Sequence, residues 1–204
     1  CSAERGAGAD RALLHGASID FFYSIPAGNQ FVIWRRVHHM TDVTDKEDNS
    51  MPIDIGLTDA QREKSVEALR KLFAETYALY SKTHGYHWNV TGPNFNGLHT
   101  MFEGQYNELW AALDEIAERI RALGHFAPTS PGALMDLASI KPDNAIPDSQ
   151  DMVANLAKGH EAVSRAAKEG LKIAADNGDD VTADLMTQRA TIAEKTAWML
   201  RVSI

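Results

Sequence analysis

The chain has 204 residues, of which 44% are hydrophobic and 24% are charged, and this balance excludes a wholly disordered or fibrous protein. Its net charge of −8 argues against electrostatic attraction to nucleic acid or anionic lipid. The single cysteine, Cys1, cannot form an intramolecular disulfide, and no apolar run approaches the roughly 20 residues that span a bilayer. We therefore expect a compact protein of the reducing cytoplasm, without a membrane segment.

Residues 1–57 differ from the remainder because no helical or strand period persists in them. Polar and turn-forming residues interrupt apolar clusters such as 21–23 and 31–34, and an acidic linker follows at 42–48. We expect an irregular or extended N-terminal segment of unknown role at 1–57 and a separate folded domain at 58–204.

The sequence from Thr58 onward predicts four long helices. Thr58 and Gln61 match a capping box at the start of the first helix. Behind it, buried-type residues recur in steps of three and four, which is the period of one helix face. Turn chemistry at 89–94 ends this helix, and Gly124 supplies the C-terminal turn of the next. The four expected helices cover roughly 59–88, 96–123, 149–177 and 180–202.

Connector lengths predict how these helices are arranged. The first and third links are short, so each joins antiparallel neighbours. The middle link, 125–148, contains four prolines and can extend up to ~80 Å, whereas a helix of about 28 residues is only ~42 Å long. This link can return along the whole bundle, with a short helix at 134–140. The expected fold is an all-α, ferritin-like four-helix bundle with a long crossover between helices two and three.

Four potential metal ligands share one stripe of the second helix. His99 and Glu103 are four residues apart, as are Asp114 and Glu118. At ~100° per residue, all four fall within a stripe about 100° wide. His87 lies on the apolar face of the first helix, at its last turn. Imidazole and carboxylate together suit iron, manganese or zinc, whereas an all-oxygen set would favour magnesium or calcium.

The spacing of the two pairs indicates a site shared between two chains. Their midpoints lie ~22 Å apart along the helix axis, whereas metal–ligand bonds are ~2 Å long. Two copies of the second helix, packed antiparallel about a two-fold axis, would bring His99 of one subunit to Asp114 of the other, twice per dimer. Tyr106, Trp110 and Leu113 share the stripe and are apolar enough to bury this interface.

Spacing alone leaves other interpretations open. A single histidine such as His87 is more often a hydrogen-bonded core residue than a ligand. The carboxylates could form a solvated face paired with Arg119 or Arg121. His125 and His160 have no companion ligands and are expected to be structural. Neither a nucleophile elbow nor a phosphate-binding loop is present in the sequence.

A long motif resembles the signature of the Dps proteins, also called mini-ferritins. It begins at 82–95, Lys-Thr-His-Gly-Tyr-His-Trp-Asn-Val-Thr-Gly-Pro-Asn-Phe, and continues through Leu98-His99, Phe102-Glu103 and the segment 114–120. The similarity extends over roughly 58–204. It implies a di-iron site shared between two subunits, whose histidine–carboxylate ligands also accept zinc. The implied ligands are His87, His99 and Glu103 from one subunit, with Asp114 and Glu118 from its two-fold partner.

The resemblance also assigns roles to residues beside the ligands. Trp88 matches a tryptophan that is thought to intercept oxidising equivalents in the family. Asp184 resembles an aspartate that lines a pore. Two positions depart from the pattern: Glu103 stands where some members carry Asp, and Val181 replaces a second acidic pore residue.

The function implied by the resemblance is that of an iron-storing ferroxidase. The family forms hollow shells of twelve subunits, built from two-fold dimers, which oxidise Fe²⁺, preferably with hydrogen peroxide, and store ferric mineral. Two adjacent irons can pass two electrons to one peroxide, so hydroxyl radical need not escape, and the cell is protected from oxidative stress. Carboxylates stabilise Fe³⁺ more than Fe²⁺. The alternative is a non-enzymatic shell that protects or condenses DNA and binds metal only structurally.

Direct DNA binding is the weaker implication of the resemblance. Residues 1–51 contain five Lys/Arg against seven Asp/Glu, and each subunit adds a charge of −8 to a shell. We predict little or no DNA affinity at physiological salt, because such a shell repels the phosphate backbone. A gel-shift titration at ~150 mM salt checks this prediction, and tight binding there would contradict it.

Overall fold

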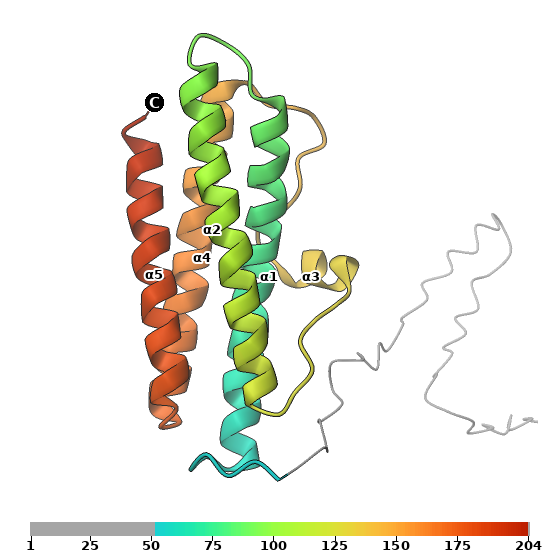
Figure 1. The fold of residues 1–204 in the computed structure, drawn as a ribbon, viewed down its shortest axis with the longest axis vertical. Helices are drawn as coiled ribbons and strands as arrows, with labels where there is room; N and C mark the ends of the chain where they lie inside the picture. The colour runs from blue at the N-terminus through green and yellow to red at the C-terminus, as the bar shows by residue number, and fades with distance from the viewer. Residues whose placement is uncertain (1–51, 204) are drawn as a thin grey trace, which may run out of the picture. The chain divides into compact units, whose positions relative to one another are not determined.

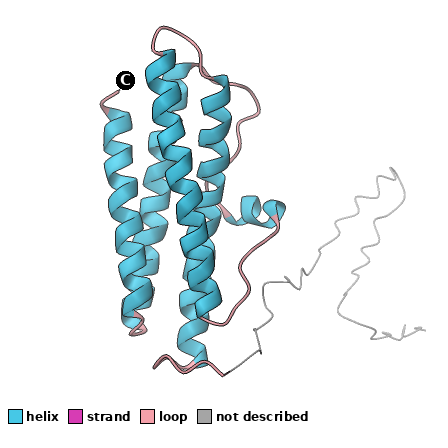
Figure 2. Ribbon diagram, viewed as in Figure 1, coloured by secondary structure: helices cyan, strands magenta, loops and turns pink. Residues whose placement is uncertain are grey.

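The structure is a computed structural model that describes residues 52–203. This range contains five α-helices and no strand: α1 (Asp59–Asn89), α2 (Phe95–Ala122), α3 (Pro131–Leu137), α4 (Ser149–Asp176) and α5 (Asp180–Arg201). The four long helices lie side by side, and the short α3 stands beside the bundle (Figure 2). Most of the segment expected to be irregular, 1–51, lies outside the described residues, and 52–58 contains no helix.

The direction of the chain confirms the predicted crossover. Figure 1 shows that α1 and α5 run one way along the bundle, while α2 and α4 run the other way. The link between α2 and α4 therefore returns along the bundle and leaves these two helices parallel. Its short helix starts three residues earlier than the expected 134–140, because the Ser130 hydroxyl accepts a bond from the Ala133 amide at 3.4 Å and Pro131 takes the first helical turn.

The predicted helix ends are confirmed by their caps. The Thr58 amide donates to Gln61 Oε1 at 2.9 Å, and the Gln61 amide donates back to Thr58 Oγ1 at 3.4 Å. Asp148 caps α4 through two backbone amides at 2.9 and 3.0 Å. Gly124 and Gly178 take positive φ values of 90° and 72° just after α2 and α4, which is why glycine ends these helices.

A single hydrophobic core fills the space between the long helices. α1 packs against α2 and α4, and α4 also packs along α5. Burying each large side chain contributes about 1.5–3 kcal/mol. Fully buried residues of this core include Leu69, Leu72, Leu79, Phe102, Leu109, Ile116, Leu156, Met186 and Leu200. None of the described helices combines the length and the apolar content that a membrane crossing requires.

Ion pairs join α2 to α5 and to the residue that caps its start, Asp179. Arg189, only 3% exposed, binds both carboxylate oxygens of Glu108 at 2.5 and 3.0 Å. Arg119 binds Asp179 at 2.6 Å and Thr182 Oγ1 at 2.9 Å. The Arg119 side chain of α2 is therefore directed toward α5, away from the acidic residues on the outer face of α2.

The crossover is fixed to α1 by a buried carboxylate. Glu75 accepts from the backbone amides of Ser139 and Ile140 at 2.8 and 3.2 Å and pairs with Lys71 at 2.8 Å. Burial alone would raise the pKa of the Glu75 carboxyl, but these three contacts and a hydrogen bond from the Ser139 side chain together hold it below its usual range. The link beyond α3 is thereby held against the middle of the bundle.

His160 lies on α4 inside the core, in agreement with its predicted structural role. It is 2% exposed, and neither ring nitrogen has a hydrogen-bond partner among the described residues. Burial, together with a smaller contribution from the nearby charge of Arg189, lowers the pKa of His160 from 6.5 to about 3. The imidazole is therefore neutral across the physiological range.

We predict that His160 makes the fold less stable as the pH falls from 6.5 toward 3. The unfolded chain binds a proton in this window and the folded chain does not, so stability is lost on acidification, by about 2 kcal/mol near pH 5. His160→Met should remove this slope above the pH at which carboxylates titrate. Urea unfolding at pH 7 and near pH 5 measures it, and an equal loss in both proteins would contradict the prediction.

Candidate metal centre

The two histidines predicted as ligands meet at the junction of α1 and α2. His87 occupies the last turn of α1 and is 9% exposed, and His99 lies in the second turn of α2. The turn between the two helices reverses the chain and brings the rings together. They stack with their centroids 3.8 Å apart and their planes inclined by 23°.

Reciprocal hydrogen bonds orient the two rings. His87 Nδ1 lies 2.9 Å from the backbone carbonyl oxygen of His99, and His99 Nδ1 lies 2.9 Å from the carbonyl oxygen of His87. Because a carbonyl only accepts, each Nδ1 carries the proton and donates it. Each Nε2 therefore keeps its lone pair. This is the tautomer in which imidazole binds a metal, and such bonds to the other ring nitrogen fix the ring's direction.

The predicted carboxylate ligands lie on the outer face of α2. These ligands are Glu103, Asp114 and Glu118, and all three are exposed. None of them forms an ion pair with any residue in the range 52–203. Arg119, one of the two predicted partners, binds Asp179 instead. Arg121 Nη1 donates to the backbone carbonyl of His125 at 3.2 Å. The arginines therefore do not turn this acidic face into a set of salt bridges.

One chain does not assemble the whole predicted ligand set. Among residues 52–203, no three His, Cys, Asp or Glu side chains converge on a point that could hold a metal ion. The structure brings His87 and His99 together but leaves Asp114 and Glu118 farther along α2, at the separation of ~22 Å that the helical rise requires. A complete site therefore needs ligands from elsewhere.

The outer face of α2 also carries exposed aromatic surface. Trp110 is 60% exposed on this face, and Tyr106 is half-buried one turn before it. The placement of Leu113 on the same interface was wrong. Leu113 is 5% exposed and belongs to the core of its own subunit, because it sits at the edge of the stripe that turns toward the bundle.

His84, which belongs to the 82–95 motif and was given no role of its own from the sequence, is the centre of a ring cluster. Its ring stacks on Tyr106 with centroids 4.1 Å apart and contacts Trp88 at 4.2 Å. Its Nδ1 lies 3.3 Å from the hydroxyl of Tyr80. The available signal was the spacing: Tyr80, His84 and His87 recur in steps of four and three and so share one face of α1.

The roles of two further predicted site residues, Trp88 and Asp184, stay predictions. Trp88 is 67% exposed beside His84, at the end of α1. Asp184 is exposed in the first turns of α5 and accepts from Gln188 Nε2 at 2.7 Å. Their positions near the protein surface are compatible with contact to another subunit or to solvent ions.

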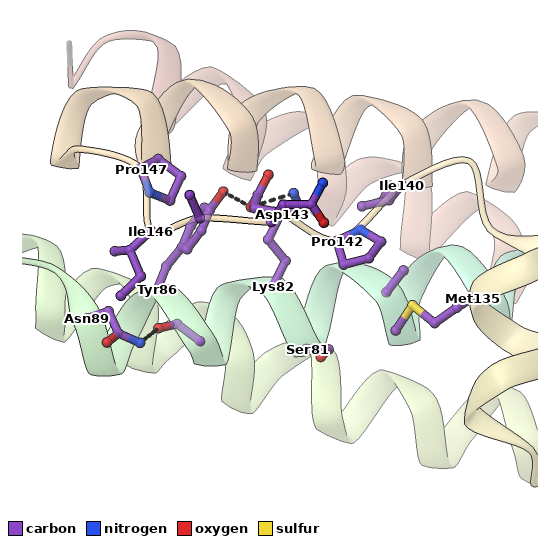
Figure 3. A pocket seen from close by; sticks show the side chains of 14 residues that line it. Ser81, Lys82, Tyr86, Asn89, Met135, Ile140, Pro142, Asp143, Ile146 and Pro147 are labelled. Carbon is purple, nitrogen blue, oxygen red and sulfur yellow. Dashed lines mark hydrogen bonds and ion pairs between the residues drawn. The ribbon is translucent and has the colours of Figure 1, made fainter.

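A pocket of about 330 Å³ lies between α1 and the crossover (Figure 3). Its lining has no histidine and a single carboxylate, Asp143, which accepts from the Tyr86 hydroxyl and pairs with Lys82 at 2.8 Å. Asn155 of α4 donates to the Tyr86 oxygen at 3.2 Å. Burial and the carboxylate of Asp143 raise the pKa of Tyr86, so it stays protonated and donating. This network holds the helix turn that precedes His87; it does not form a second metal site.

Comparison with known proteins identifies the class of this bundle. A family model described as a ferritin-like domain matches residues 66–203. An uncharacterized low temperature-induced protein from Nostoc sp. is 39% identical over 151 residues, which cover 73% of this chain and 84% of that protein. The DNA protection during starvation protein 2 of Bacillus anthracis is 37% identical over 136 residues, covering 67% of this chain and 93% of that protein.

A solved structure agrees with these sequence matches. The Dps protein from Vibrio cholerae, described as a member of a broad superfamily of ferritin-like diiron-carboxylate proteins, has a TM-score of 0.71 and 33% identity. The alignment covers 76% of this chain and 98% of that one. The predicted all-α bundle with its crossover is thus confirmed as a shared fold.

Proposed function

This chain belongs to the Dps family of ferritin-like proteins, and from that premise we propose that it oxidises Fe²⁺ at di-iron sites shared between two subunits. Iron storage and protection are the general functions of this superfamily. The finer proposal is that hydrogen peroxide is the oxidant, and that ferric mineral accumulates inside a cytoplasmic shell of twelve subunits built from two-fold dimers.

The observation that carries the proposal is the incomplete ligand set. His87 and His99 present two Nε2 lone pairs in one place, because their Nδ1 protons are held by backbone carbonyls. Imidazole nitrogen without carboxylate would bind iron weakly and would not favour Fe³⁺. Asp114 and Glu118, exposed carboxylates with no cationic partner among residues 52–203, lie on the same chain but out of reach.

An antiparallel pair of α2 helices completes both sites at once. The point midway between the His99/Glu103 and Asp114/Glu118 pairs falls between residues 108 and 109 of α2. Trp110 lies only ~2 Å along the axis from this centre. Its exposed indole supplies the apolar surface that a two-fold contact buries, with the acidic ligands on either side.

Within such a site, the residues of the chain divide the chemistry. We assign His87, His99 and Glu103 to one wall and the partner's Asp114 and the partner's Glu118 to the other. The carboxylates neutralise the charge that grows when Fe²⁺ becomes Fe³⁺. Two irons side by side deliver the two electrons that reduce one peroxide to water. Asp184 is proposed to attract Fe²⁺ at a pore.

The net charge of the chain argues against DNA condensation as the main role. The name of the Bacillus anthracis relative refers to DNA protection. In this chain the charge of −8 per subunit favours protection through removal of iron and peroxide over contact with the phosphate backbone.

We predict that His99→Ala and Asp114→Ala each reduce peroxide-driven Fe²⁺ oxidation by more than the ~10–100-fold that loss of a supporting group costs. Co-assembly of the two variants should restore about a quarter of the wild-type rate, because half of the dimers are mixed and each mixed dimer regains one intact site. Stopped-flow absorbance of the ferric product measures the rates.

Glu115→Ala is the matched control for this experiment, since Glu115 is also an exposed carboxylate of α2 but lies outside the ligand stripe. It should oxidise iron as the wild type does. Unchanged rates in both ligand variants would disprove the ferroxidase. Inactive single variants that gain nothing on co-assembly would disprove the sharing of sites between subunits.

We further predict that Trp110→Glu abolishes metal binding without removing a ligand. It places two like charges at the two-fold centre, which opposes association of the helices. Co²⁺ titration followed by d–d absorbance, with sedimentation velocity on the same samples, measures both effects. Trp198→Glu alters a tryptophan of similar exposure on α5 and should retain Co²⁺ binding; full Co²⁺ affinity in a monomeric Trp110→Glu would overturn the idea.

A further inference from the structure

A continuous chain of rings leads from the histidine pair to the exposed face of α2. Tyr106 meets His87 edge to face with centroids 5.1 Å apart, and it stacks on His84 at 4.1 Å. Tyr80 follows His84 at 5.6 Å, and Trp110 follows Tyr80 at 5.4 Å. Each aromatic ring in this series is followed directly by the next, without an aliphatic side chain between them. Each step is short enough for efficient electron transfer, which weakens steeply with distance.

One contact in this series of rings determines which tyrosine can lose a proton together with an electron. Oxidation of a phenol is favourable only if its proton can leave, because the phenol radical cation is a very strong acid. The Tyr80 hydroxyl lies 3.3 Å from His84 Nδ1, in an orientation that allows it to donate there. Tyr77, the neighbouring tyrosine at 6.5 Å from the Tyr80 ring, makes no such contact with any imidazole in the described part of the chain. Tyr80 is therefore the tyrosine of this cluster with a base beside it.

We propose that Tyr106, His84, Tyr80 and Trp110 form a one-electron relay between the metal half-site and the centre of α2, in which His84 accepts the phenolic proton of Tyr80. His84 is not needed as a ligand for this role. Trp88, at 4.2 Å from His84, is a side branch of the same relay.

The relay deepens the proposed function and rests on it for its purpose. Hydrogen peroxide takes up two electrons and two protons to form two waters. A site that holds a single Fe²⁺ supplies one electron, and Tyr80 supplies the other through the rings. The O–H bond of Tyr80 breaks, its proton moves to His84 Nδ1, and the two protons for water come from solvent. A later Fe²⁺ returns the electron, and His84 returns the proton.

The end of the relay suggests what it connects. Trp110 is 60% exposed and lies within ~2 Å, along the helix axis, of the proposed two-fold centre. The partner's Trp110 would lie at the same centre. An oxidising equivalent that reaches Trp110 can then pass to the relay of the other subunit and be reduced by an Fe²⁺ bound there, so that two half-filled sites act as one full site.

The relay is testable without iron. The full-length protein is stripped with a chelator and oxidised by photoexcited tris(bipyridine)ruthenium with persulfate, then frozen for electron paramagnetic resonance. We expect a neutral tyrosyl radical in the wild type that is lost in Tyr80→Phe and in His84→Phe. The second variant keeps a stacking ring on Tyr106 but has no base. Tyr77→Phe is the matched control and should keep the wild-type signal.

Folding of the variants is checked by their melting temperatures, and His84→Ala with added imidazole provides an independent arm. Return of the radical on adding imidazole supports the base role, and no return in a variant that melts like the wild type contradicts it. A wild-type signal in His84→Phe, or equal losses in Tyr77→Phe and Tyr80→Phe, overturns the relay. A protein that forms the Tyr80 radical yet oxidises no iron would overturn the proposed function and leave the relay standing.

Discussion

The stiffness of α2 is the constraint on which the rest of this structure depends. An α-helix rises by ~1.5 Å per residue whatever its sequence, so Asp114 and Glu118 cannot reach the imidazoles of the same chain. The bundle offers no other route, because its inner surface is filled by core side chains and by the ion pair between Arg189 and Glu108. In the proposed function these carboxylates act as ligands only across a two-fold axis, and metal affinity is then coupled to assembly.

Local order at the histidine pair compensates for this division. The reciprocal bonds of His87 and His99 to each other's backbone carbonyls set both tautomers before any metal arrives. The preceding turn is itself held, since Tyr86 bridges Asp143 of the crossover and Asn155 of α4. The long crossover is therefore more than a connection between parallel helices. It fixes the end of α1, so the metal binding that we propose at His87 and His99 would remove less conformational entropy.

The sequence predicted the fold well because each element carries its own local signal. The capping box at Thr58, the cap at Asp148 and the glycines at 124 and 178 act within a few residues. Their geometry therefore follows from the local sequence alone. Leu113 and His84 were harder. Leu113 sits at the edge of a helical stripe, where a turn of a few degrees decides between core and surface. Tyr80 lies on the same face of α1 as His84, so the sequence spacing contains that contact. Tyr106 comes from α2, and no single-helix pattern contains its contact with His84.

Two separate requirements favour aromatic residues on the outer face of α2. A two-fold contact needs apolar surface at its centre, and a redox path needs rings that are neither ligands nor remote from them. Aliphatic side chains at positions 106 and 110 would satisfy the first demand and fail the second. Tyr106 and Trp110 satisfy both, and acidic residues lie on either side of them on the same face. The composition of this face is thus better explained by interface and chemistry together than by interface alone, since burial by itself would not select aromatic rings spaced within 5.6 Å of one another along two helices.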